Sequence, residues 1–245
     1  MKRLIALFVF FALALAAADF WNTKPFTDWT DKDLQKMMTD SPWSKKESIS
    51  SGPGPTPPSL GGGGGGGRGG RGGASAGGDD SAPPPISEGR GGGAPVGGPI
   101  GTPSQTIFVR WQSALPLKQA LVRTRFGKEA ASSPDAKKYL DTEEMAYVIC
   151  VSQFPLRRRT GEEFRQELIK LSSLSVKGKD SLAPLDVQIQ LNPKGGSADI
   201  YYFFPRQRAF TLEDGEVEFL SKLGDQPVKQ KFKLKDMMFE GKLAL

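Results

Sequence analysis

Few residues in this chain could do chemistry, and the missing types matter most. Its 245 residues contain no histidine and a single cysteine, Cys150. This excludes Ser-His and Cys-His nucleophile systems, histidine or clustered-thiolate metal sites, and proton transfer by imidazole. We therefore expect no catalytic residue, no metal site and no cofactor.

Carboxylates are the remaining candidates for acid–base chemistry. Glu143 and Glu144 are adjacent, as are Glu162 and Glu163, but neighbours in sequence do not by themselves provide the opposed pair that a glycosidase needs. Glu162 and Glu163 also suit the first turn of a helix, where negative charge is favourable. A small carboxylate-dependent hydrolase stays open as the alternative to a non-catalytic protein.

Basic residues form the second group of candidates. Lys229, Lys231, Lys233 and Lys235 alternate along one predicted strand face, and Arg157, Arg158 and Arg159 are consecutive. Either cluster could bind an anionic polymer. Lysine on a terminal strand is also a guard against edge-to-edge association, so a solvated face is the competing interpretation.

The strand with the lysines pairs with the one before it in a predicted hairpin. We take 224–227 as the connection. One face then pairs Phe219 with Phe232 and Val217 with Leu234, and the other pairs Glu218 with Lys233 and Glu216 with Lys235. Apolar residues meet apolar residues and opposite charges meet, as expected of a true pairing.

The rest of the chain from residue 105 reads as a mixed domain. Strands are predicted over 106–112, 144–154, 187–191 and 200–204, and helices over 117–125, ending at Gly127, and 160–174, opened by a capping box of Thr160 and Glu163. The polar stretch after Gly127 carries no predicted element. The fold class is therefore α+β, predominantly antiparallel, with two main helices.

Composition divides the chain into four parts. Residues 51–104 hold 22 Gly and 10 Pro in 54 positions, which cannot build a side-chain core, so we predict a disordered linker. It separates an arm, residues 19–50, from the globular domain, residues 105–245. Its GGGGGGGRGGRGG run has no aromatic neighbours and its three arginines are offset by three acids, so we interpret it as a tether and expect no nucleic acid.

The arm gathers aromatic and sulfur-containing side chains. Thr30 and Asp33 suit a helix start, Leu34, Met37 and Met38 fall on one helical face, and Pro42 ends the helix. The candidate partner-binding residues are Trp21, Trp29, Leu34, Met37, Met38 and Trp43. Three interpretations stay open: docking on the chain's own domain, recognition of another envelope component, and interfacial membrane attachment, which the arm's net charge of −1 disfavours.

The first eighteen residues predict the cellular location of the protein. Lys2 and Arg3 precede an unbroken apolar run, Leu4 to Leu15, and three alanines stand before Asp19. This pattern is typical of a cleaved secretory signal peptide, and the run is short for a membrane span. We expect an exported, periplasmic or extracellular, envelope-associated protein without a transmembrane segment after cleavage. In such a protein Cys150, which stands in an apolar strand, is expected to be a buried hydrophobe.

Two segments carry a resemblance. WTDKDLQKMMTDSPW near the start, and FPR followed by KFKLKDMMFEGKLAL at the end, resemble those of uncharacterised exported bacterial proteins of the acidobacterial kind. The resemblance implies no activity. The expected function is a non-catalytic interaction protein of the envelope or periplasm, whose partner is another envelope protein or an anionic envelope polymer. The alternative is a small hydrolase of an envelope polymer.

Overall fold

The computed structural model describes residues 20–50, 104–155, 161–193 and 195–245. The predicted signal peptide, Arg157 to Arg159 and the glycine run lie outside these residues. The described residues belong to one compact unit, which joins the arm to the rest of the chain.

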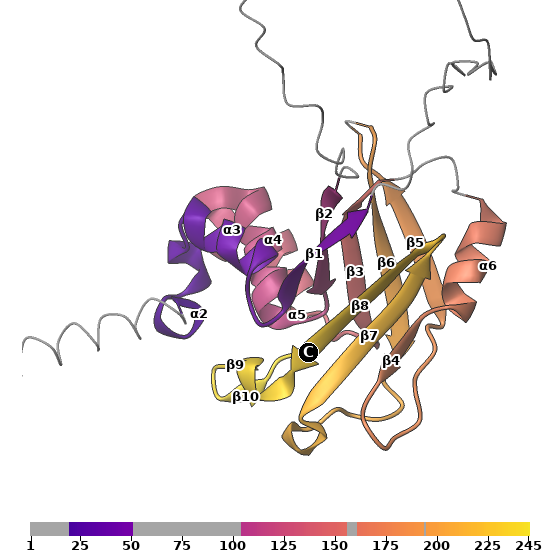
Figure 1. Cartoon of the computed structure of the whole chain (residues 1–245). Helices are drawn as coiled ribbons and strands as arrows, with labels where there is room; N and C mark the ends of the chain where they lie inside the picture. The colour runs from indigo at the N-terminus through magenta and orange to yellow at the C-terminus, as the bar shows by residue number, and fades with distance from the viewer. Residues whose placement is uncertain (1–19, 51–103, 156–160, 194) are drawn as a thin grey trace, which may run out of the picture. The chain divides into compact units, whose positions relative to one another are not determined.

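The fold is α+β with antiparallel sheets, as predicted (Figure 1). A five-stranded sheet has the order β1-β2-β3-β6-β5, a three-stranded sheet the order β4-β7-β8, and β9 and β10 pair near the C-terminus. The strands are β1 Ser44–Ser50, β2 Ser104–Trp111, β3 Ala146–Phe154, β4 Ser173–Ser175, β5 Asp186–Leu191, β6 Ala198–Pro205, β7 Glu216–Leu223, β8 Gln226–Lys233, β9 Met238–Phe239 and β10 Lys242–Leu243.

The helices pack at opposite ends of the sheets. α3 contacts α4 and β1, and α5 contacts α4, whereas α6 contacts β5 and β7 (Figure 1). The α-helices are α2 Phe20–Thr23, α3 Asp31–Thr39, α4 Leu115–Phe126, α5 Pro134–Asp141 and α6 Glu162–Lys170. Short 3-10 helices are η1 Phe26–Asp28, η2 Gly127–Ala131, η3 Leu212–Asp214 and η4 Leu234–Asp236.

The core lies between the two sheets. The rings of Trp111 and Phe232 meet edge to face with centroids 5.3 Å apart, and Tyr202 and Phe219 do so at 5.2 Å. Alternating residues of β7 and β8, including Val217, Phe219 and Phe232, supply the second layer and are fully buried. The opposite face of the larger sheet carries Arg110, Cys150 and Tyr201, which are aligned across β2, β3 and β6.

Two helix predictions need correction. α6 ends at Lys170, and Leu174, predicted to be helical, lies in β4 paired with Phe219. The N-cap residue of α6 is Gly161, which has no side chain to cap the helix. The predicted cap residue, Thr160, lies outside the described residues. α5 was not predicted at all. It begins where the Ser133 hydroxyl accepts a hydrogen bond from the Ala136 amide and Pro134 opens the first turn.

The hairpin register is two residues away from the predicted one. Phe219 and Phe232 do share the buried face, but Val217 pairs with Phe232 and Glu216 with Lys233. The connection is shorter than predicted, only Gly224 and Asp225, because β8 begins at Gln226. A shift of two residues leaves the side chains of β7 and β8 on their predicted faces, but Leu234 and Lys235, predicted to continue the strand, lie in η4.

The arm is part of the sheet. β1 pairs along its length with β2, and the pair Ser50–Ser104 brings together the two ends of the Gly/Pro-rich segment. That segment therefore connects two neighbouring strands of one unit, as expected if the arm docks on its own domain. β2 begins at Ser104, one residue before the predicted domain boundary.

Candidate interaction surfaces

The arm residues predicted to bind a partner lie in the core of their own chain. Trp21, Trp29, Leu34, Met37 and Trp43 are buried, and Met38 is half-buried against the same core. Trp29 is only 1% exposed. The five buried side chains are not available to another molecule in this fold, and Met38 is only partly available, so the prediction of a partner-binding set is corrected to the self-docking alternative.

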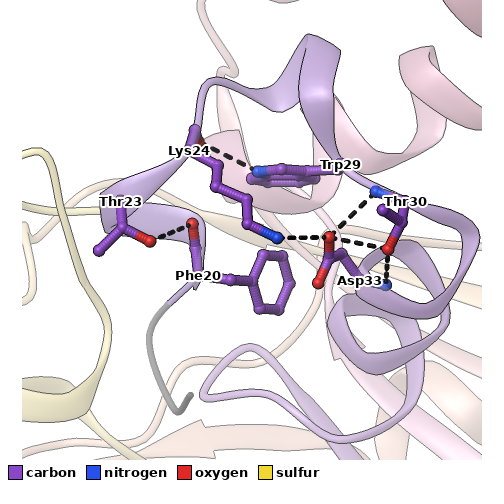
Figure 2. A network of polar contacts seen from close by, with 6 residues as sticks. All are labelled: Phe20, Thr23, Lys24, Trp29, Thr30 and Asp33. Atoms are coloured by element: carbon purple, nitrogen blue, oxygen red, sulfur yellow. Dashed lines mark hydrogen bonds and ion pairs between the residues drawn. The ribbon is translucent and has the colours of Figure 1, made fainter. Parts of the chain in front are cut away.

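Local bonds hold the arm in this shape (Figure 2). Thr30 and Asp33 form the capping box that opens α3, the ammonium of Lys24 lies 3.2 Å from the Asp33 carboxylate, and the Trp29 indole donates to the Lys24 carbonyl at 3.2 Å. Burial alone would raise the pKa of Asp33. The bonds from Thr30 and Lys24 outweigh this effect and lower it below 3.8.

Bonds to distant residues fasten the arm to the body. The Trp43 indole donates to the Ala244 carbonyl at 2.7 Å, and the Trp43 carbonyl accepts from the Trp111 amide at 2.7 Å. The Arg110 guanidinium donates to the Met38 carbonyl at 2.7 Å. The arm is thus tied both to β2 and to the C-terminal residues.

Two of the three lysines of β8 are paired with carboxylates of the neighbouring strand β7. The ammonium of Lys229 lies 3.0 Å from the Glu218 carboxylate, and that of Lys231 lies 2.6 Å from Glu216. The pKa of Lys231 is raised by its hydrogen bond and charge interaction with Glu216. These two predicted basic-surface residues therefore have partners on β7. Arg157, Arg158 and Arg159, the other predicted cluster, lie outside the described residues.

The thiol of Cys150 and the ammonium of Lys118, two groups that could take part in catalysis, are both buried and have a role in the fold. The Cys150 thiol is enclosed, and burial raises its pKa from 9.0 to about 12, so it stays protonated at neutral pH. The Lys118 ammonium, which is buried, lies 2.9 Å from the Glu144 carboxylate. Within the described ranges no group of three His, Cys, Asp or Glu side chains could hold a metal ion.

A groove of about 760 Å³ lies between the two helices α4 and α5 and the sheet. We call it the α4–α5 groove. It is lined by Leu121, Val122, Thr124, Arg125, Phe126, Asp135, Tyr139, Gln190 and Tyr201. It combines three aromatic rings with a guanidinium, a carboxylate and an amide. Such a mixture of apolar area and a few planar polar groups is typical of a ligand site.

The phenols of this groove keep their protons at neutral pH. Burial raises the pKa of Tyr201, and Cys150 and Asp199 raise it further. Burial, together with Glu144, also raises the pKa of Tyr139. The Tyr201 hydroxyl is hydrogen-bonded to the Cys150 thiol, whereas that of Tyr139 can donate to an acceptor in the groove.

These groove residues were missed in the sequence, although part of the signal was present. Asp135 and Tyr139 are spaced i, i+4, which places them on one face of a helix once Ser133 and Pro134 mark its start. Gln190 and Tyr201 share one face of neighbouring strands, which only the strand register reveals. No sequence pattern shows that α4 and α5 lie against this face.

No protein-family model, curated protein or solved structure matches this chain. Among the helices in the described part of the chain, none is long and apolar enough to cross a membrane.

Proposed function

We propose that this chain is a non-catalytic, exported protein of the cell envelope that binds a sugar-based polymer of the envelope in the α4–α5 groove. Export is supported by the sequence of residues 1–18. The observation that carries the choice of ligand is the lining of the groove, where Tyr139, Phe126 and Tyr201 lie beside Arg125, Asp135 and Gln190.

The chemistry of this lining suits a sugar ring. A pyranose presents a face of C–H groups, which packs on an aromatic ring, and a rim of hydroxyls, which pair with amide, carboxylate and guanidinium groups. The Lys118 ammonium lies over one face of the Tyr139 ring, 5.0 Å from its centroid, and the residue is 41% exposed, which leaves the other face for such packing. Planar polar side chains set the orientation of the ligand.

Charge favours an anionic polymer. Residues 105–245 hold 23 basic and 18 acidic residues, a net of +5, which attracts polyanions over a distance. Inside the groove Arg125 and Asp135 balance each other, so the sugar backbone itself supplies most of the contact.

Binding to purified cell-wall sacculi or to a soluble anionic polysaccharide tests the proposal. The full chain, expressed with its leader, is recovered from the periplasmic fraction with Asp19 as its first residue and titrated with the polymer. We expect Tyr139→Ala to weaken binding about tenfold through loss of ring contact, and Tyr139→Phe to keep it within about threefold.

A matched pair of glutamines controls for general effects. Gln190 lines the groove, whereas Gln188 is two residues away on the same face of the same strand and outside it. Gln190→Ala weakens polymer binding and Gln188→Ala leaves it unchanged. Equal effects of the two substitutions, or failure of the chain to bind either polymer, would contradict the proposal.

The alternative function is a carboxylate-dependent hydrolase of an envelope polymer. A cleft of about 450 Å³ between α5 and the C-terminal residues includes Asp141, Glu143, Glu144 and Glu240 in its lining, which is the observation that favours it. Glu144 is engaged by Lys118. The appearance of new reducing ends on the polymer during the titration would favour this alternative over a binding protein.

A further inference from the structure

The outer edges of the two sheets are protected unequally. β1 carries Lys45 and Lys46, and β8 carries three lysines, all of which discourage a further strand. These two edges also meet, because Glu47 accepts hydrogen bonds from the Gln230 amide group at 2.9 Å and from the Lys229 backbone at 3.5 Å. Leu182 covers β4 through a pair of backbone bonds with Leu174.

The fourth edge, β5, has none of these protections. Its sequence after Asp186 is VQIQL, without lysine or proline, and no strand among the described residues pairs with its outer side. Leu191 at its end is 61% exposed. An unprotected edge of this kind is a template for an added strand.

The pairing of β5 with β6 shows which backbone groups of β5 remain available to hydrogen-bond an added strand. The Asn192 amide donates to the Ser197 carbonyl, so even-numbered residues bond toward β6 and odd-numbered ones point outward. The Val187 amide is satisfied by the Asp186 carboxylate at 2.8 Å. The amides and carbonyls of Ile189 and Leu191 are directed away from β6.

A groove runs along this edge. It has a volume of about 380 Å³, and its walls are the start of α6 (Gly161, Glu162 and Arg165) and residues 186–189 of β5. α6 lies beside β5 (Figure 1). A helix beside an open strand edge leaves a slot for one extended chain, whose backbone pairs with the edge while alternate side chains contact the helix.

The charges of the groove indicate what kind of chain fits. Arg165 is shared by two carboxylates, with nitrogen–oxygen distances of 3.1 Å to Glu162 and 3.0 Å to Asp186. Among the lining residues that the structure describes, two negative charges stand against one positive charge. A lysine or arginine in the added strand would balance the excess negative charge.

We propose that the β5 edge is a docking site for an extended, basic segment of a partner protein, which adds to the five-stranded sheet as a sixth strand. A second copy of this chain fits less well. A symmetric contact would bring the Glu162 and Asp186 carboxylates of two copies together, and β5 itself carries no lysine or arginine to balance them.

Peptide selection tests this proposal. A library of twelve-residue peptides on phage is panned against the immobilised mature chain, and the recovered peptides are synthesised. We expect alternating apolar and polar residues with at least one lysine or arginine. At saturation the chosen peptide should slow hydrogen exchange at the amides of Ile189 and Leu191.

Two substitutions of Leu191 separate backbone pairing from side-chain contact. Leu191→Pro removes an outward amide and leaves the pairing with β6 intact, so it should weaken peptide binding about tenfold. Leu191→Ala keeps the amide and should bind within about threefold. Melting curves confirm that both variants are folded.

A charge pair supplies the test should the proline variant fail to fold. Gln188 is exposed in the groove wall, so Gln188→Lys should weaken binding of the basic peptide and Gln188→Glu should not. Three results would overturn the proposal: no peptide recovered above background, protection of amides elsewhere, or protection of Ile189 and Leu191 by raised protein concentration alone, which assigns the edge to a second copy. None depends on the α4–α5 groove, so the two proposals fail separately.

Discussion

Cys150 illustrates how the fold decides the chemistry of a single side chain. The thiol lies on a sheet face beside Arg110 and Tyr201 and is 1% exposed. Burial is the largest contribution to its raised pKa, and the charge of Asp199 adds to it, while Arg110 and a hydrogen bond to Tyr201 act in the opposite direction. The only cysteine is therefore a protonated core side chain, which agrees with its apolar sequence setting.

The shifted pKa predicts a pH dependence of stability. The folded chain holds the thiol proton up to a pKa of about 12, whereas the unfolded chain releases it near 9.0. The stabilisation is complete below pH 9.0 and is lost as the pH rises toward 12, because the unfolded state loses its proton first. Denaturant unfolding between these pH values should show a steeper loss of free energy for the wild type than for Cys150→Ala.

Iodoacetamide gives an independent check on the same side chain. At neutral pH the native chain should react far more slowly than the urea-unfolded chain, because only the thiolate is nucleophilic. Equal pH slopes for the wild type and Cys150→Ala, combined with rapid native labelling, would show that the thiol is accessible and ionises normally.

At the scale of elements, the last hairpin shows what sequence patterning can and cannot determine. Alternation assigned Val217, Phe219 and Phe232 to the buried face, and they are buried. It could not distinguish two registers that differ by two residues, since both keep apolar residues on one face and opposite charges on the other. The geometry of the turn makes that choice.

Gly224, in the turn between β7 and β8, determines the register of the hairpin. Its φ is +65°, a conformation that glycine adopts freely and other residues adopt at a cost. Gly224→Ala should lower the free energy of unfolding by about 1–3 kcal/mol, whereas the neighbouring Asp225→Ala, whose φ is not positive, should change it by less than about 0.5 kcal/mol. Urea titration measures both. A larger loss for Asp225→Ala would place the strained position elsewhere in the turn.

The sequence analysis predicted helix α4 but missed helix α5. The hydrophobic spacing in 117–125 and the stop at Gly127 predicted α4 well. α5 is short, but Ala136, Tyr139 and Leu140 fall at i, i+3 and i+4 after the start signals Ser133 and Pro134. This helix could therefore have been predicted from its sequence, and it was missed. The α4–α5 groove depends on both helices and on β6, and such long-range placement is not encoded in any local pattern.

At the scale of the whole molecule, the arm is a structural part of the fold. It supplies the edge strand β1 and, with Trp29, Met37 and Trp43, some of the most buried side chains in the described chain. A helix as short as α3 is marginal in water and gains its stability from tertiary packing. The apolar face of α3 packs against α4 and β1 of its own chain.

Cutting the chain between arm and body tests this integration. A protease site placed within residues 61–73 should be cleavable, and the two fragments should then stay together in gel filtration, since β1 remains paired and the aromatic residues remain buried. The uncut chain is the control. In the cut chain, Trp43→Ala should release the arm, because loss of a buried tryptophan costs about 3–5 kcal/mol. Separation of the wild-type fragments on dilution would mean that the arm is only loosely held.

The closing of residues 51–103 between two paired strands has a consequence for assembly. Fully stretched, this connection would span roughly 170 Å, much more than the few ångströms between Ser50 and Ser104 in their pair. So long a connection turns back without strain, which lets β1 pair with β2 of its own copy. Shortening it until it can no longer turn between Ser50 and Ser104 would force β1 to pair in a neighbour instead, and exchanged dimers would then form as the chains are concentrated.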